Sequence, residues 1–368
     1  MAAALTGDVA TAVSDLADAR DQLPDPAPRG LTVLLGGAGA VVEAMGGALD
    51  RASRHLAGLA AATVAPDPMA AERFDELAVT VTAAGGALDA ARAVLRGATS
   101  PTPRGRLLAA WLDLRTGHLG HARERLVAAS GAPVLRRDAL LGAAVSVGLA
   151  RRSGDAHALA DTWHRVAPVA AGADVELLLL DLWGELSVAS ALVSPTDRDD
   201  VVAAMRAAVV RAGSPAWAVG AEQWWRLERA AATGDAAEAA DAAARLAAMQ
   251  HTRADAAAVW ADVLGGRVCP AAVDAAATQL AGAGLRVEAA ALCRAAATRT
   301  TDPAAARRLL GTGRGLRTST GAPGRPEGEG ARSHRPRRRA GAPGPVRAGP
   351  PRARCRRSPH ARAARPRP

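Results

Sequence analysis

The pentapeptide Gly-Gly-Ala-Leu-Asp occupies residues 46–50 and returns unchanged at residues 85–89, 39 positions later. In both copies an apolar run precedes the two glycines, and a run of mixed polar and apolar residues follows them. Glycine often ends a helix, because it adopts the left-handed backbone conformation without steric strain. The pentapeptide therefore predicts a tight turn between two helices at each of the two places.

A weaker pattern extends outward from the second glycine of each copy, with a small residue five positions on and a bulky one nine positions on. Three anchors carry both positions: Gly47/Ala52/Leu56, Gly86/Ala91/Leu95 and Gly117/Ala122/Leu126. Gly154 keeps only the bulky position (Trp163), whereas Gly234 and Gly284 keep only the small one (Ala239 and Ala289). The small residue lets two helices approach and the large one fills the seam, which is typical of helical-hairpin repeats. The uneven anchor spacing indicates degenerate tetratricopeptide-like hairpins.

The remaining sequence also favours helices. Ala and Leu are strong helix formers, no alternating Val/Thr run of strand length occurs, and Gly, Pro or Asp interrupts the chain every 12–20 residues. The clearest predicted helices span residues 106–115, 136–152, 175–193, 199–211, 216–232 and 236–250. The predicted fold is all-α, a tetratricopeptide-like stack of helical hairpins (an α-solenoid).

A change in composition at residue 317 sets the main predicted boundary. Residues 317–368 contain 15 Arg against two acids, are rich in Pro and Gly, and contribute +13 to the net charge of +10, which leaves −3 for residues 1–316. Such a segment buries too little apolar surface to offset the entropy of ordering. We expect N-terminal helical hairpins over 1–99, a tetratricopeptide-like domain over 100–316 and a disordered basic tail over 317–368.

The composition excludes several kinds of enzyme. Lys, Asn, Ile and Tyr are absent, so the chain has no Walker A motif, no Schiff-base lysine and no phenolic acid or base. The glycine-rich stretch 36–39 lacks both the third glycine of a dinucleotide fingerprint, where Val42 stands, and the Lys-Ser/Thr of a phosphate loop. We interpret it as a helix-packing surface of small residues. The sequence predicts no enzyme and no cofactor.

No metal site is predicted. His118 and His121 lie three residues apart, but no further His, Cys or acid joins them at ligand spacing, and we interpret them as surface residues beside a turn at Gly120. Cys269 and Cys293 are interpreted as small core residues, and the odd cysteine count fits a reducing cytoplasm. No basic signal-peptide start is visible, and the longest uncharged apolar run, residues 30–42, is shorter than the roughly 20 residues that span a bilayer. We expect a cytoplasmic protein.

Six of the seven tryptophans fall between residues 163 and 260. Trp217, Trp224 and Leu227 share one helical stripe and are predicted core residues. Trp225 projects about 100° away from that stripe. It is therefore either a further core residue or part of a surface that binds a protein or small-molecule effector.

The tail carries the candidate phosphate contacts, namely Arg335, Arg337, Arg338, Arg339, Arg352, Arg354, Arg356 and Arg357. Arginines of this kind bind DNA weakly and in a salt-dependent way, and no aromatic residue stands between them to stack on bases. The alternative is a disordered end without a function.

Several stretches follow a common layout. Residues 284–292 (Gly-Leu-Arg-Val-Glu-Ala-Ala-Ala-Leu) lead into 295–302 (Ala-Ala-Ala-Thr-Arg-Thr-Thr-Asp) and 303–310 (Pro-Ala-Ala-Ala-Arg-Arg-Leu-Leu), while 114–117 and 150–155 are Leu-Arg-Thr-Gly and Ala-Arg-Arg-Ser-Gly-Asp. In this layout the chain resembles the helical region upstream of the DNA-binding domain in large actinobacterial LuxR-family transcriptional regulators. The resemblance covers roughly residues 100–318 and implies a sensory or partner-binding helical region.

The chain departs from that family at both ends. It has no phosphate loop for the ATPase domain that often precedes this region, and the Arg/Pro tail stands where a helix-turn-helix would begin. Ser-His-Arg-Pro-Arg at 333–337 can be encoded by TCT CAC CGA CCG CGA, which read one base later gives Leu-Thr-Asp-Arg and the start of an acidic residue. We therefore hypothesise a frame-shifted, lost DNA-binding domain. The alternative is a free-standing helical-repeat scaffold whose Arg tail binds anions non-specifically.

Overall fold

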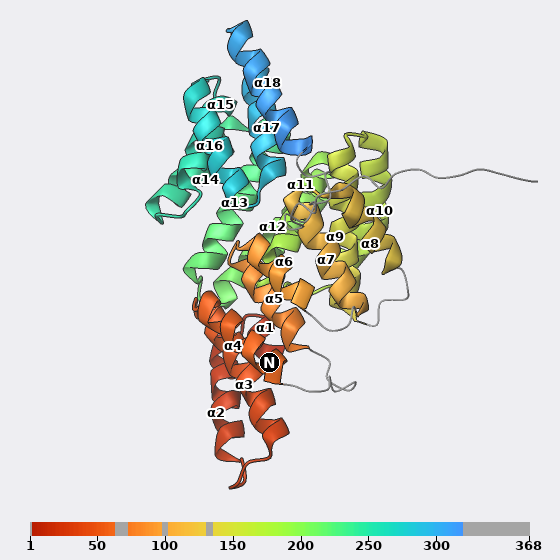
Figure 1. Cartoon of the computed structure of the whole chain (residues 1–368), viewed down its shortest axis with the longest axis vertical. Coiled ribbons are helices and arrows are strands. Elements are labelled where there is room, and N and C mark those ends of the chain that lie inside the picture. Colours follow the sequence, from red (N-terminus) through yellow and green to blue (C-terminus); the bar gives the residue numbers. More distant parts are fainter. Residues whose placement is uncertain (1, 63–72, 98–101, 130–134, 319–368) are drawn as a thin grey trace, which may run out of the picture. The chain divides into compact units, whose positions relative to one another are not determined.

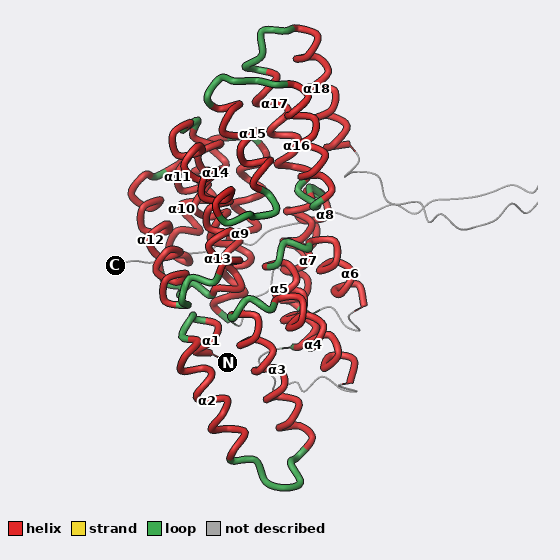
Figure 2. The backbone as a smooth tube through the Cα atoms, turned by 90° about the vertical axis from the view of Figure 1, so that its left-hand side faces the viewer, coloured by secondary structure: helices red, strands yellow, loops and turns green. Residues whose placement is uncertain are grey.

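The computed structural model describes residues 2–62, 73–97, 102–129 and 135–318. Within these ranges every regular element is a helix and no strand occurs, as Figure 2 shows, which confirms the predicted all-α class for this part of the chain. The described helices belong to one compact unit, so the predicted boundary at residue 99/100 lies inside it. Residues 319–368, which hold nearly all of the predicted tail, lie outside the described residues.

Figure 1 shows the helices that the described residues form, coloured in chain order. Their bounds are α1 Ala2–Leu5, α2 Val9–Asp21, α3 Arg29–Met45, α4 Leu49–Ala62, α5 Phe74–Ala84, α6 Leu88–Gly97, α7 Pro103–Thr116, α8 Leu119–Ala128, α9 Arg136–Ser153, α10 Ala156–Ala171, the 3₁₀ turn η1 Leu177–Leu179, α11 Leu180–Val193, α12 Pro195–Arg211, α13 Ala216–Thr233, α14 Ala236–Ala248, α15 Ala254–Leu264, α16 Pro270–Gly282, α17 Arg286–Ala297 and α18 Pro303–Thr318.

Short polar side chains start several of these helices. Thr102 accepts a hydrogen bond from the Gly105 backbone N–H at 2.8 Å, and a proline follows it at the first helical position. Asp235 likewise accepts from the Glu238 N–H at 2.9 Å at the start of α14. These bonds satisfy N–H groups that have no partner inside the helix, which stabilises a helix by about 1 kcal/mol.

The six glycines predicted to turn the chain all have left-handed backbone angles. Their φ values are 98° at Gly47, 79° at Gly86, 88° at Gly117, 77° at Gly154, 78° at Gly234 and 81° at Gly284. The small residues predicted five positions later are fully buried: Ala52, Ala91, Ala122, Ala239 and Ala289. The turn glycines and the small residues of the hairpin pattern are therefore as predicted, because each turn needs φ > 0 and each of these helices packs through an alanine. Of the bulky residues, Leu56 and Trp163 are buried, whereas Leu95 and Leu126 are only partly buried.

One predicted helix is wrong in its first turn. The segment 175–193 was expected to be one helix, but α11 begins only at Leu180 and a separate 3₁₀ turn occupies Leu177–Leu179. Leu177 and Leu178 are buried, and this turn packs against α5. Tertiary packing of three consecutive leucines therefore overrides their helix propensity.

The helices pack in a regular order. From α5 to α17 each odd-numbered helix contacts the next odd-numbered one and also pairs with the helix that follows it in sequence. Figures 1 and 2 both show α17 and α18 side by side as one such pair. In addition α17 contacts α7, so the run of odd-numbered helices from α7 to α17 returns to its start.

Glycines allow close approaches between helices, both among the odd-numbered helices from α5 to α17, which we call the inner helices, and between α3 and α5. A Cβ on Gly184 of α11 would lie 2.1 Å from the Trp225 indole of α13, so the ring lies directly on the α11 backbone. The glycine-rich stretch of α3 works in the same way, since a Cβ on Gly37 would lie 2.2 Å from the Phe74 ring. This supports the helix-packing interpretation of residues 36–39.

We expect Gly184→Ala to destabilise the protein by roughly 1–3 kcal/mol, the usual cost of overpacking a core. The added methyl group collides with a buried indole that has no room to withdraw. Gly58→Ala in α4 is the matched control, because a Cβ there has nothing within 4 Å and the better helix propensity stabilises the helix. Urea denaturation followed by circular dichroism measures both; equal effects would contradict the close packing at Gly184.

Candidate functional site

Six charged side chains from five inner helices are buried together in the compact unit. This buried charge cluster consists of Arg115 of α7, Arg151 and Arg152 of α9, Glu185 of α11, Glu228 of α13 and Glu288 of α17. Charged residues are seldom fully buried unless they are paired, because removal from water costs several kcal/mol per ion. The cluster therefore marks the most unusual environment among the described residues.

Glu185 is the best-satisfied member of the cluster. Its carboxylate accepts two bonds from Arg151, at 2.7 Å from Nε and 3.1 Å from Nη2, and one from Arg152 Nη1 at 2.8 Å. Burial alone would raise the pKa of Glu185, but the two guanidinium groups outweigh it and hold the pKa at about 2. Glu185 is therefore ionised at neutral pH and binds α11 to the C-terminal end of α9.

Glu288 is buried with much poorer partners. Arg152 Nη2 lies 3.8 Å and Arg115 Nη1 lies 3.9 Å from its Oε1, which is too far for a hydrogen bond. Its Oε2 has no hydrogen-bond partner in the protein, and the same is true of the Arg152 Nε and Nη2 atoms. Buried polar atoms without partners are rare and costly, so they call for a water molecule or a ligand.

Glu228 completes the cluster on α13. Burial, and next the charge of Glu288, raise the pKa of Glu228 to about 7, although Arg151 and Arg115 oppose the shift. No hydrogen bond or ion pair joins Glu228 to another described residue. At neutral pH this carboxyl group therefore exchanges between its protonated and its ionised form.

Trp225 belongs to this buried region and does not line a partner surface. Its side chain is 1% exposed, its indole N–H donates to Asp181 Oδ1 at 2.6 Å, and the Arg115 guanidinium lies 4.4 Å above its ring centroid. The proposed surface role of Trp225 is thus wrong, because α13 packs between α11, α14 and α15 and is buried on more than one stripe. Trp224 and Leu227 are core residues as predicted, and Trp217 is half-buried.

The buried charge cluster lies at the base of a pocket of about 690 Å³. Arg152, Glu228 and Glu288 form what we call the floor, and Arg286, Arg294 and Arg317 form the rim arginines. The turns after α7 and α9, one face of α8 and the end of α18 complete the lining. This volume falls in the range of sites that bind small organic molecules, roughly 300–1,000 Å³.

His118 and His121 lie in the wall of this pocket with their rings stacked at 6.1 Å. His118 Nδ1 lies 3.0 Å from Thr116 Oγ1, and burial, followed by the charge of Arg92, lowers the pKa of His118. The turn expected at Gly120 occurs instead at Gly117, and Gly120 lies inside α8. A neutral His118 in this wall adds a hydrogen-bonding group without adding charge.

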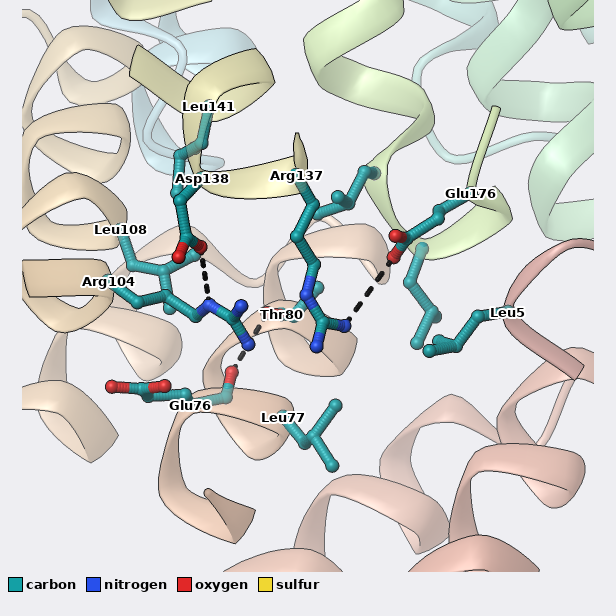
Figure 3. Close-up of a pocket in the computed structure, with 12 residues that line it drawn as sticks. Leu5, Glu76, Leu77, Thr80, Arg104, Leu108, Arg137, Asp138, Leu141 and Glu176 are labelled. Atoms are coloured by element: carbon teal, nitrogen blue, oxygen red, sulfur yellow. Dashed lines mark hydrogen bonds and ion pairs between the residues drawn. The ribbon is translucent and has the colours of Figure 1, made fainter. Parts of the chain in front are cut away.

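Two other cavities have their charges paired internally. The one shown in Figure 3 holds about 30 Å³, enough only for water, between α5, α7, α9 and η1. Arg104 Nε lies 2.6 Å from Asp138 Oδ1 and Arg137 Nη1 lies 3.9 Å from Glu176 Oε2 across it. In an open groove between α12, α13 and α14, Arg229 and Glu238 likewise form an ion pair, with Nη2 and Oε1 2.5 Å apart. We interpret these ion pairs as structural and neither cavity as a binding site.

The candidate phosphate contacts of the tail, from Arg335 to Arg357, lie outside the described residues. No group of three or more His, Cys, Asp or Glu side chains suited to a metal ion occurs in the described ranges. Cys293 is buried as expected, whereas Cys269 is exposed at the start of α16 and is not a core residue. The sequence analysis missed the buried charge cluster, although Arg115 and Arg152 share one visible signal, since each stands two residues before a hairpin glycine.

Comparison of the chain with protein-family models, with curated proteins and with solved structures gave no match. Among the described helices, none has both the length and the apolar character that crossing a membrane requires. The pocket and its buried charge cluster therefore carry the functional interpretation.

The raised pKa of Glu228 predicts a specific pH dependence of stability. The folded state holds a proton on Glu228 up to about pH 7, whereas the unfolded chain releases it near 4.5, the ordinary pKa of a glutamate side chain. The folded state thus binds more protons between these values, and stability falls as pH rises through that window, by roughly 3 kcal/mol in total. We expect Glu228→Gln to remove this fall and to be more stable than the wild type at pH 8.

Chemical denaturation between pH 4.5 and 8 measures this effect. Glu222→Gln on the same helix is the matched control, because Glu222 lies outside the cluster and its nearest cation, Arg206, is 3.7 Å away at the surface. The lowered pKa values of His118 and His251 oppose the fall equally in both proteins, so the wild type is compared with Glu228→Gln. A stability difference between these two proteins that stays constant between pH 4.5 and 7 would contradict the assignment of a buried, proton-binding Glu228.

Proposed function

We propose that the helical part of this chain is the effector-sensing region of a transcriptional regulator that resembles the LuxR family, acting in the cytoplasm. Its arrangement is a degenerate tetratricopeptide-like stack, and its effector binds in the pocket above the buried charge cluster. The pocket supports this proposal because the turn after α7 and the helices α8, α9, α13, α17 and α18 all line it. A molecule bound there contacts segments from both ends of the resembling region.

One observation carries the proposal furthest. Three of the five stretches on which the resemblance rests, 114–117, 150–155 and 284–292, supply Arg115, Arg151, Arg152 and Glu288. They are far apart in sequence, yet their charged side chains meet in one cluster at the base of one pocket. A shared site explains why these separate turns carry charged residues at buried positions.

Selection from a pool of randomised DNA fragments tests the regulatory role. For a working regulator we expect one sequence to be enriched and to stay bound in the presence of competitor DNA at about 200 mM salt. The scaffold alternative predicts no enriched sequence and binding that disappears by that salt concentration. In that case a full-length variant with Arg335, Arg337, Arg338 and Arg339 changed to Ala would also bind less DNA.

The nucleotide sequence tests the hypothesis of a lost DNA-binding domain. If the gene was shifted by one base, the alternative frame past codon 333 encodes a helix-turn-helix pattern. An alternative frame that encodes no such pattern would refute the frame-shift hypothesis and leave the pocket unaffected.

A further inference from the structure

The rim of the pocket is strongly basic. Arg286 and Arg294 both lie on α17, and neither has a carboxylate partner among the described residues. Burial, followed by the charge of Arg317, lowers the pKa of Arg294, and both side chains line the pocket. Guanidinium groups in this situation bind carboxylate or phosphate oxygens in a forked geometry.

The floor has the opposite need. Glu288 is 2% exposed and leaves Oε2 without a hydrogen-bond donor. Arg152, 4% exposed, cannot relieve this because its Nη2 stands 3.8 Å away. Burial and the charge of Glu288 keep the pKa of Glu228 raised although nearby arginines oppose the shift. A ligand group that carries N–H donors, above all an ammonium group, would satisfy both carboxylates at once.

We propose that this pocket binds a small organic oxyanion, a phosphate or a carboxylate, that carries an amino group at its other end. The oxyanion binds to the rim arginines, and the amino group binds to Glu228 and Glu288 on the floor. This inference gives the chemical class of the effector and so rests on the proposed sensing role. It goes beyond that role by assigning an orientation to the ligand.

The positions of these groups also indicate how binding affects the stability of the protein. The oxyanion holds α17 to the end of α18, and the amino group holds α17 to α13, next to the place where α17 returns to α7. The ligand therefore adds a contact at each end of the pocket. Binding at both ends stabilises the compact unit by mass action.

Calorimetric titration of the full chain tests the proposal with three probes. Phosphoethanolamine carries both groups, ethyl phosphate lacks the amino group, and γ-aminobutyrate replaces the phosphate by a carboxylate. We expect phosphoethanolamine to bind at least about tenfold more tightly than ethyl phosphate, because a hydrogen-bonded charged group adds roughly that much. The ratio of phosphoethanolamine to γ-aminobutyrate then decides which oxyanion the rim prefers.

The variants separate the pocket from the basic tail, which is present in every sample. Arg286→Ala combined with Arg294→Ala is expected to weaken phosphoethanolamine about tenfold or more. Arg299→Ala combined with Arg307→Ala removes the same charge outside the pocket and is expected to change nothing. Glu228→Gln is expected to weaken phosphoethanolamine and to leave ethyl phosphate unchanged.

Equal titrations for the wild type and the Arg286/Arg294 variant would overturn the proposal, since binding would then belong to the tail. Equal binding of phosphoethanolamine and ethyl phosphate would overturn the role of the floor. These outcomes are separate from the DNA experiment. A probe that binds in the pocket of a protein without sequence-specific DNA binding leaves the ligand class standing and excludes a working DNA-binding regulator, which the hypothesis of a lost DNA-binding domain also predicts.

Discussion

Glu185→Ala is expected to lower the free energy of unfolding by about 3–5 kcal/mol, which is the cost of removing one partner from a buried ion pair. The substitution leaves Arg151 and Arg152 buried with their only close carboxylate gone, since all three bonds that Glu185 accepts come from these two residues. Many domains are stable by only about 5–15 kcal/mol. We therefore expect a large shift of the urea midpoint, or loss of folding, as followed by circular dichroism.

Glu43→Ala is the matched control, because Glu43 also accepts from an arginine, Arg51 Nε at 3.1 Å, but both side chains are exposed. An exposed pair of this kind contributes less than about 1 kcal/mol. Glu185→Gln separates charge from packing, because glutamine fills the same space without the charge. A Glu185→Ala protein as stable as the Glu43→Ala protein would show that the cluster does not hold α9 to α11.

The placement of the buried pairs also explains how the pocket keeps its shape. Arg151 and Arg152 are fixed by Glu185 behind them, so the floor of the pocket is held in place before any ligand binds. Preorganisation of this kind lowers the entropy that a ligand must lose on binding. The same two arginines thus support both the fold and the proposed site.

The hairpin glycines show which parts of the fold can be predicted from the sequence. The repeated pentapeptide is enough to predict the turns at Gly47 and Gly86, because a positive φ is a local requirement that glycine meets within its own residue. The burial of Ala52 and Ala91 follows from the same local pattern. Helix positions, turns and one packing face are therefore predictable.

The buried charge cluster was not predictable in the same way. Arg115 and Glu288 are 173 positions apart, and nothing near either residue indicates that α17 returns to α7. The helical pattern left Trp225 open between a core position and a partner surface, because one stripe of α13 already accounted for a core. An inner helix packed between several neighbours buries more than one stripe, and only the tertiary structure shows which helices are inner ones.

Trp225→Ala is the second substitution for which we expect a large effect, about 3–5 kcal/mol, the usual cost of deleting a buried aromatic side chain. The change opens a cavity against Gly184, leaves Asp181 without its donor and takes away the ring beneath the Arg115 guanidinium. Trp217→Ala on the same helix is the control and is expected to cost less, because Trp217 is only half-buried.

Trp225→Phe identifies which of these contacts matters most. Phenylalanine keeps a ring under Arg115 but loses the bond to Asp181 and part of the volume packed on Gly184, so we expect a cost of about 1–2 kcal/mol by urea denaturation. Because Gly184→Ala pushes on the same indole, its cost is expected to shrink in the Trp225→Ala background, where the ring is absent. Costs that simply add would contradict the contact between this indole and the α11 backbone.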